Sequence, residues 1–181
     1  MLPRPIATTR QQRGDAYEDL AFMLGSLGIV RRAEGQTGEA LSLLREALAT
    51  ARTFKTNGYA AIYWTSALAE SLEGVDLAEC ERLWREGLEI CLQNPNFGPS
   101  HRRTLDNQFG IARVLVRQRR TDEALSALPP LIASYETRFG SNYYGTVGAQ
   151  AWLALALDQK GETAAVARLY ADMYPRLMES M

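Results

Sequence analysis

An internal repeat is the feature of this sequence that most constrains its fold, because repeated segments of this length stack into arrays. One amphipathic block occupies residues 39–48, and related blocks follow at 79–88, 123–128 and, more weakly, 165–170. In the first block the apolar residues recur at spacings of three and four, which places them on one face of an α-helix. They are Ala40, Leu44, Ala47, Leu48 and Ala51.

A second apolar helix is expected ahead of each block, separated from it by a short turn at 34–38, 73–76, 118–122 or 160–163. Glycine often ends a helix in the left-handed conformation, and Ser, Thr and Asp commonly cap the next one. Asp76, with Glu79 three residues later, is a capping-box pattern. The expected left-handed glycines are Gly35, Gly74 and Gly161, and the other candidate caps are Thr37, Thr121 and Thr163.

A single helix–turn–helix unit cannot bury its own apolar face, so neighbouring units must stack into a solenoid. The sequence therefore predicts an all-α chain of eight helices in four repeats, at about 15–54, 58–92, 100–138 and 142–179. Residues 15–181 form the expected repeat domain, and residues 1–14 an extended N-terminal segment.

A longer match joins the last two repeats, because the stretch from Phe97 to Thr104 reappears 42 residues later from Phe139 to Thr146. The second helix of the third repeat contains Pro129 and Pro130. Proline lacks the backbone N–H that an α-helix needs, so a kink or break is expected there.

Composition argues against several functional classes. The chain has 20 basic and 21 acidic residues and a net charge of −1, whereas a nucleic-acid binder usually has a basic excess. With one histidine and two cysteines, a metal site is not expected. No phosphate-binding glycine loop or catalytic motif is present. His101 has no nucleophile or acid beside it in the sequence. We therefore expect a protein that is not an enzyme and uses no cofactor or metal.

The expected location is the cytoplasm of a bacterium. The first ten residues contain no apolar stretch that could act as a signal-peptide core, and no segment is apolar enough to cross a membrane. Cys80 and Cys91 are expected to be buried and unpaired. Only two of the 20 basic residues, Lys55 and Lys160, are lysines, which is typical of a GC-rich bacterial genome.

The repeats resemble tetratricopeptide repeats (TPRs), whose pattern the first unit follows with Leu27-Gly28, Gly35, Ala40 and Ala47. The 42-residue offset and the phrase from Phe97 to His101 are similar to the kinesin-light-chain subtype, which is also common in bacterial signalling proteins. The resemblance implies a right-handed superhelix whose first helices line a concave groove. Such grooves bind peptides, extended segments or other domains.

Placing the inward positions of the family on this chain yields candidate residues for binding a partner. Their most distinctive members are Arg113 and Arg117, one helical turn apart, which would suit a partner with an acidic segment. The alternative is that these arginines only solvate an exposed face. Trp152 is the aromatic candidate. The candidate residues are Phe22, Ile29, Arg32, Asp106, Asn107, Phe109, Arg113, Arg117, Trp152 and Asp158, with Ile62, Thr65, Ala69 and Glu73 in the second repeat.

The last predicted helix has a wider apolar stripe than a terminal helix needs, which favours a homodimer or a docking edge at Tyr170, Met173, Tyr174 and Leu177. The leading interpretation of the whole chain is a non-catalytic scaffold that binds a protein or peptide partner, with no binding to nucleic acid or membrane. The alternatives are a ligand- or peptide-sensing regulatory domain of a bacterial signalling protein and a self-assembling structural element.

Overall fold

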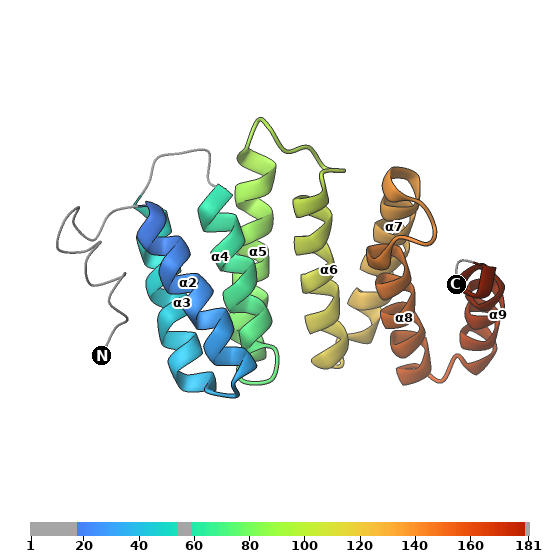
Figure 1. The fold of residues 1–181 in the computed structure, drawn as a ribbon. Helices are drawn as coiled ribbons and strands as arrows, with labels where there is room; N and C mark the ends of the chain where they lie inside the picture. The colour runs from blue at the N-terminus through green and yellow to red at the C-terminus, as the bar shows by residue number, and fades with distance from the viewer. Residues whose placement is uncertain (1–17, 54–58, 180–181) are drawn as a thin grey trace. The chain divides into compact units, whose positions relative to one another are not determined.

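A computed structural model describes residues 18–53 and 59–179 (Figure 1). The side chains of Glu18, Leu177 and Glu179 lie outside the description, as does the expected N-terminal segment 1–14. The described residues form eight helices and no strand, which confirms the all-α prediction. The helices are α2 (Glu18–Ala33), α3 (Thr37–Arg52), α4 (Tyr59–Leu72), α5 (Leu77–Gln93), α6 (Arg102–Arg117), α7 (Thr121–Phe139), α8 (Tyr144–Gln159) and α9 (Thr163–Glu179).

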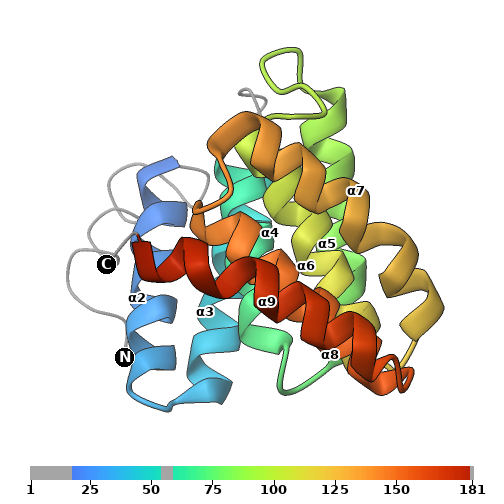
Figure 2. The same cartoon turned by 90° about the vertical axis from the view of Figure 1, so that its right-hand side faces the viewer.

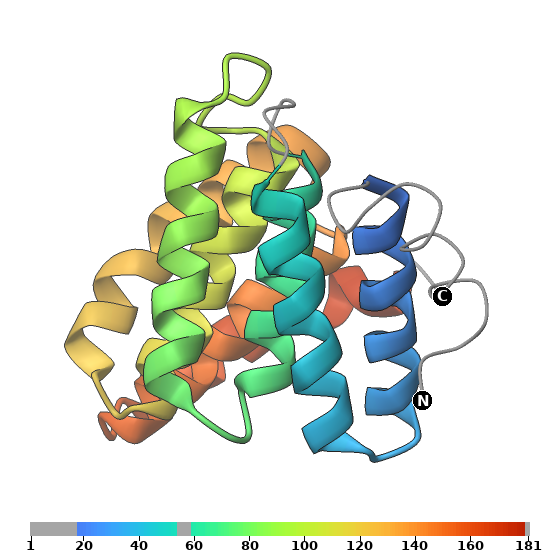
Figure 3. The ribbon, with the colours of Figure 1, turned by 90° about the vertical axis from the view of Figure 1, so that its left-hand side faces the viewer.

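The chain divides into two compact units, one ending at Asn96 and the other beginning at Phe97. In the first unit α2 packs on α3, α3 on α4 and α4 on α5; Figure 3 shows the first two side by side. In the second unit α6, α7, α8 and α9 pack in the same succession. Consecutive helices in each unit are thus also neighbours in space, as stacked helix–turn–helix repeats require.

The predicted apolar stripe forms the core of the first unit. Ala40, Leu44, Ala47, Leu48 and Ala51 are all buried, as are Leu24, Trp64 and Leu83 of the other helices of this unit. In the second unit the corresponding core contains Leu105, Val114, Leu128 and Tyr135. Burial of one apolar face per helix is the main force that holds each unit together.

The two matching stretches found in the sequence make the same local structure. The Thr104 hydroxyl donates a hydrogen bond of 2.9 Å to the carbonyl of Gly98, and the Thr146 hydroxyl donates one of 2.9 Å to the carbonyl of Gly140. Both threonines are fully buried. Each hydroxyl therefore satisfies a loop carbonyl just before a repeat begins, which explains why this stretch of sequence occurs in both repeats.

The turns agree only partly with the sequence predictions. Gly35 and Gly161 have the expected positive φ, but Gly74 does not, because Val75 and Asp76 continue to bond the Leu72 carbonyl. In the third repeat the non-glycine Arg119 takes a positive φ of 60° instead. The left-handed residue is thus set by turn length as well as by the presence of glycine.

One predicted helix cap is confirmed and three are wrong. The Asp76 carboxylate accepts hydrogen bonds of 3.0 Å from the backbone N–H groups of Ala78 and Glu79. Thr37, Thr121 and Thr163 are instead the first residues of their helices, because the carbonyl one residue earlier already accepts the first helical bond. The cap positions fall on Gln36 and Arg120, whose side chains do not cap the helix.

Of the kink or break predicted at Pro129 and Pro130, the break does not occur: α7 is continuous from Thr121 to Phe139. The prolines leave two carbonyls of the preceding turn without an N–H partner. Both prolines are exposed, so solvent can hydrate that side of the helix. The Ser134 hydroxyl also donates a hydrogen bond of 2.9 Å to the carbonyl of Pro130 itself.

Candidate functional site

One row of side chains on α6 contains four of the predicted binding residues. Asp106, Phe109, Arg113 and Arg117 follow one another at spacings of three or four, and Arg102 extends the row at the start of the helix. Helix α8 packs beside α6 in the same unit. We call the surface formed by Arg102, Phe109, Arg113 and Arg117 of α6 with Tyr144 and Trp152 of α8 the α6–α8 face.

Each of the three arginines on the α6–α8 face lies against an aromatic ring. The guanidinium carbon is 5.6 Å from the centre of the Tyr144 ring for Arg102, 5.4 Å from Phe109 for Arg113 and 5.4 Å from Trp152 for Arg117. Contacts of this kind are attractive because the ring face is electron-rich. The rings therefore hold the guanidinium groups in place on this surface.

The absence of a side chain at Gly148 lets α6 and α8 approach closely at the centre of the face. A Cβ atom at this position would lie 3.3 Å from Cζ of Phe109, tighter than an ordinary van der Waals contact. The Phe109 ring therefore packs directly against the backbone of α8. Because that ring also supports Arg113, Gly148 helps to position an arginine on the neighbouring helix.

The carboxylate in this row, Asp106, is half-buried and already engaged. It accepts a hydrogen bond of 3.0 Å from the hydroxyl of Tyr135 and lies 3.6 Å from Nε of Arg102. Burial raises the pKa of Asp106, although the Tyr135 hydrogen bond and the Arg102 charge act in the opposite direction. The Arg102 guanidinium also hydrogen-bonds the Tyr144 hydroxyl, so this cluster ties α6 to both α7 and α8.

Replacing Asp106 by asparagine is expected to change the pH dependence of stability. The folded-state pKa of this carboxyl is raised, so the folded protein takes up its proton at a higher pH than the unfolded chain. Wild type therefore gains unfolding free energy as the pH falls from neutral through that folded-state pKa, whereas Asp106→Asn does not. Asparagine keeps a carbonyl acceptor for Tyr135, so the variant should be at least as stable at neutral pH.

Urea unfolding at neutral and mildly acidic pH measures this difference. The stability advantage of Asp106→Asn over wild type should shrink as the pH falls. Asp158→Asn, at an exposed position of α8, controls for the general effect of removing a carboxylate. An advantage that stays constant or widens toward acid pH would contradict the raised pKa.

Two other predicted residues of the second unit are placed differently from those in the row. Asn107 is fully buried and donates a hydrogen bond of 2.7 Å to the Arg103 carbonyl, so the prediction that it lines an open binding surface is wrong. Asp158 is exposed near the end of α8. Adjacent residues of a helix point in different directions, so Asp106 and Asn107 cannot both face the same surface. Which of the two is buried depends on how α6 packs, and the pair of residues in the sequence does not show this.

The predicted residues of the first unit make a smaller surface. The Phe22 ring packs edge-on against Trp64 at 5.4 Å, Ile29 is half-buried, and the Arg32 guanidinium lies 3.2 Å from the Ser71 hydroxyl and 3.7 Å from Glu70. Arg32 is thus held by α4. In the second repeat the prediction is wrong for Ile62, Thr65 and Ala69, which are buried, and Glu73 is half-buried.

The predicted docking residues of α9 divide between its two faces. Tyr170 and Tyr174 are exposed, but Met173 is buried and therefore does not belong to an exposed edge. The Leu177 side chain lies outside the described residues.

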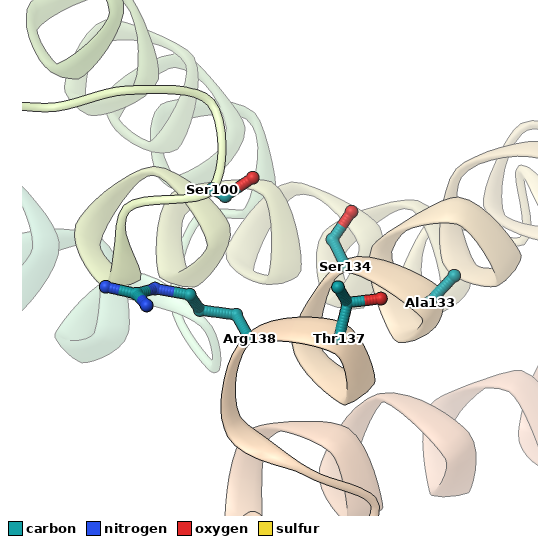
Figure 4. A pocket seen from close by; sticks show the side chains of 5 residues that line it. All are labelled: Ser100, Ala133, Ser134, Thr137 and Arg138. Carbon is teal, nitrogen blue, oxygen red and sulfur yellow. The ribbon is translucent and has the colours of Figure 1, made fainter.

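A surface hollow that sequence reasoning missed lies in the second unit. It has a volume of about 490 Å³ and is lined by Ser100, Ala133, Ser134, Thr137 and Arg138 (Figure 4). Ser100 comes from the loop before α6, and the other four lie on α7. No motif marks these residues, since they meet only through tertiary packing. The hydroxyl groups and the guanidinium suit polar contacts, and the lining contains no nucleophile–base pair.

Within residues 18–53 and 59–179 no group of three or more histidine, cysteine or acidic side chains is arranged to hold a metal ion. Across the same ranges, no helix combines the length and the apolar character that crossing a lipid bilayer requires. Cys80 and Cys91 are buried and form no disulfide, as expected, and the Cys80 thiol donates a hydrogen bond of 3.1 Å to the Ala69 carbonyl.

Comparison with known proteins gives the fold. No family model and no curated protein matches the chain. Two solved structures of nearly identical TPR-like repeats, from a Podosopora anserina protein assigned as a kinesin light chain, are similar to it. One is a single-substitution variant with a TM-score of 0.81, 19% identity and coverage of 97% of this chain and 82% of that one. The other has a TM-score of 0.80 and 18% identity, and the match covers 97% of this chain and 83% of that one.

A third solved structure, BtubC (BKLC) from P. vanneervenii, has a TM-score of 0.74 and 14% identity, and the match covers 92% of this chain and 66% of that one. Identities this low establish the fold alone. The chain therefore has the α-solenoid fold of kinesin-light-chain TPR-like repeats, which confirms the fold that the sequence resemblance implied.

Proposed function

We propose that this chain is a non-catalytic interaction scaffold that binds an acidic segment of a partner protein along the α6–α8 face. The observation that carries the proposal is the set of three arginines, each lying against an aromatic ring of that face. The TPR-like fold is consistent with this role, since stacked repeats present extended binding surfaces.

Supported arginines suit the recognition of carboxylates. A guanidinium group carries five N–H donors, and a cation–π contact with a ring uses none of them as a hydrogen bond, so a ring can support an arginine that also binds a carboxylate. Holding the side chain in advance also reduces the entropy lost on binding. Asp106, the carboxylate of the same row, accepts a hydrogen bond from Tyr135 and pairs with Arg102, so the proposed contacts with the acidic segment centre on Arg113 and Arg117.

The spacing along α6 indicates how the partner's acids should be arranged. Arg113 and Arg117 are four residues apart, which is about 6 Å along the helix axis, and Arg102 is about 16 Å from Arg113. Acids two residues apart in an extended segment, or four apart in a helix, match the shorter spacing. A third acid farther along would compete with Asp106 for Arg102.

Fluorescence polarisation with a labelled ten-residue polyglutamate peptide tests the proposal. Wild type should bind it with an affinity that falls as salt is raised. The Arg113→Glu/Arg117→Glu variant should bind about tenfold more weakly or worse, because both bidentate partners become repulsive. Trp152→Ala should weaken binding less, since it removes only the support of Arg117.

The matched control is Arg138→Glu/Arg168→Glu, which makes the same change in net charge at two exposed positions outside the face. It should bind like wild type. An equal loss of affinity in the control variant would show that only net charge matters. Equal binding of a polyglutamine peptide would show that the site does not recognise carboxylates. Equally tight binding of a short single-stranded DNA would indicate a general anion surface. Each of these results overturns the proposal.

A further inference from the structure

Helix α9 presents an unusual exposed stripe in the second unit. Ala167, Tyr170, Ala171, Tyr174 and Met178 follow one another at helical spacing, and all are exposed. The opposite side of the helix, with Val166, Leu169 and Met173, is turned away from solvent. In Figure 2 α9 lies in front of α8, and no other described helix of its unit covers its outer face.

The internal repeat shows that the positions of the two tyrosines are normally covered. At the 42-residue offset, Tyr170 corresponds to Leu128 of α7 and Tyr174 to Ile132. Leu128 and Ile132 are 0% and 8% exposed, whereas Tyr170 and Tyr174 are 53% and 66% exposed. Leu131 and its counterpart Met173, by contrast, are both buried, at 4% and 5%.

The difference between the two helices is one packing partner. In this unit α7 packs extensively against both α6 and α8, whereas α9 packs extensively against α8 and contacts α7 through an ion pair of 4.0 Å between Arg176 and Glu136. Helix α8 packs on α7 with small residues, among them the buried Gly145, where an added Cβ atom would lie 2.9 Å from Cε1 of Tyr135. The exposed stripe of α9 is therefore the kind of surface that a helix with small residues at regular spacing covers elsewhere in the same chain.

We infer that a second copy of this chain covers the stripe, by antiparallel packing of the two α9 helices. The stripe alternates small and large side chains, so it is complementary to itself. Pairing about the midpoint of Tyr170 and Ala171 sets Tyr170 of one copy against Ala171 of the other, and Tyr174 against Ala167. Each ring then enters the space beside an alanine, as in close helix packing.

Sedimentation velocity of the full chain over a concentration series, from low micromolar to several hundred micromolar, tests this inference. Wild type should form a species of twice the 20.1 kDa of one chain. Tyr170→Glu/Tyr174→Glu should weaken the self-association about tenfold or more, because it places charge in an apolar contact. Tyr59→Glu, at another exposed tyrosine, is the matched control and should dimerise like wild type.

Cysteine cross-linking tests the orientation, since both native cysteines are buried. In the antiparallel arrangement Ala171→Cys should form an intermolecular disulfide on oxidation, whereas Met178→Cys, far from the two-fold axis, should not. A monomer at every concentration would overturn the inference, as would a dimer that survives the double glutamate substitution or cross-links only at Met178. These measurements do not involve the acidic peptide, so they are independent of the proposed function.

Discussion

Gly25→Ala is expected to destabilise the first unit by about 2–3 kcal/mol. An added Cβ atom would lie 2.2 Å from Cζ3 of Trp64, far inside van der Waals contact. Trp64 is fully buried between Phe22 and Tyr63 and has little room to move. The better helix propensity of alanine favours the variant by only about 1 kcal/mol, so the steric clash decides the outcome.

Urea unfolding followed by circular dichroism measures this effect, and Gly38→Ala is its control. No atom lies within 4 Å of a Cβ built at Gly38, so this substitution should be neutral or slightly stabilising. A Trp64→Leu substitution should relieve part of the penalty of Gly25→Ala, because the two positions are in contact. If Gly25→Ala is as stable as wild type, the close packing of α2 on Trp64 is wrong.

Tyr135→Ala is expected to destabilise the second unit by about 3–5 kcal/mol, the range for truncating a large buried ring. Tyr135 is completely buried, and its ring contacts Phe109, Phe139 and Tyr143 at centroid distances of 6.4, 6.2 and 5.7 Å. It thus joins the core of the unit to the ring that supports Arg113. Amide hydrogen exchange should show the lost protection concentrated in α6, α7 and α8.

Tyr135→Phe separates the hydroxyl from the ring. The variant should lose only about 1–2 kcal/mol, because it keeps the packing and removes the hydrogen bond to Asp106. That hydrogen bond lowers the pKa of Asp106, so the pKa should rise further in the variant, which an NMR titration of the carboxyl can follow. If the pKa of Asp106 falls or does not change, the Tyr135 hydroxyl does not act on this carboxylate.

The periodic features of the fold were predictable from the sequence. The apolar stripe at Ala40, Leu44 and Ala47 needs only helical spacing to be recognised, and the structure buries it. The matching stretches that end in Thr104 and Thr146 are recognisable as a repeated sequence motif, and in the structure they make the same hydrogen bond. In both cases the signal is local in the chain, so no knowledge of packing was required.

Features that depend on neighbours were predicted less well. Proline chemistry indicates a break at Pro129, but packing and exposure to solvent allow α7 to continue. A threonine before a helix is a plausible cap, yet the helices begin at Thr37 and Thr121 themselves. A helix cap is worth about 1 kcal/mol and a proline inside a helix costs about 3 kcal/mol, and the tertiary contacts of a helix can together exceed both.

The candidate face shows the same division. The sequence by itself determined the repeat, the helical content and the row formed by Asp106, Phe109, Arg113 and Arg117, because helical periodicity places them on one side. Only the tertiary structure decided that Arg117 lies against Trp152, that Phe109 packs on Gly148 and that Tyr135 engages Asp106. Those contacts join residues 29 to 39 positions apart, and their formation depends on how α6, α7 and α8 pack, which spacing along the chain does not encode.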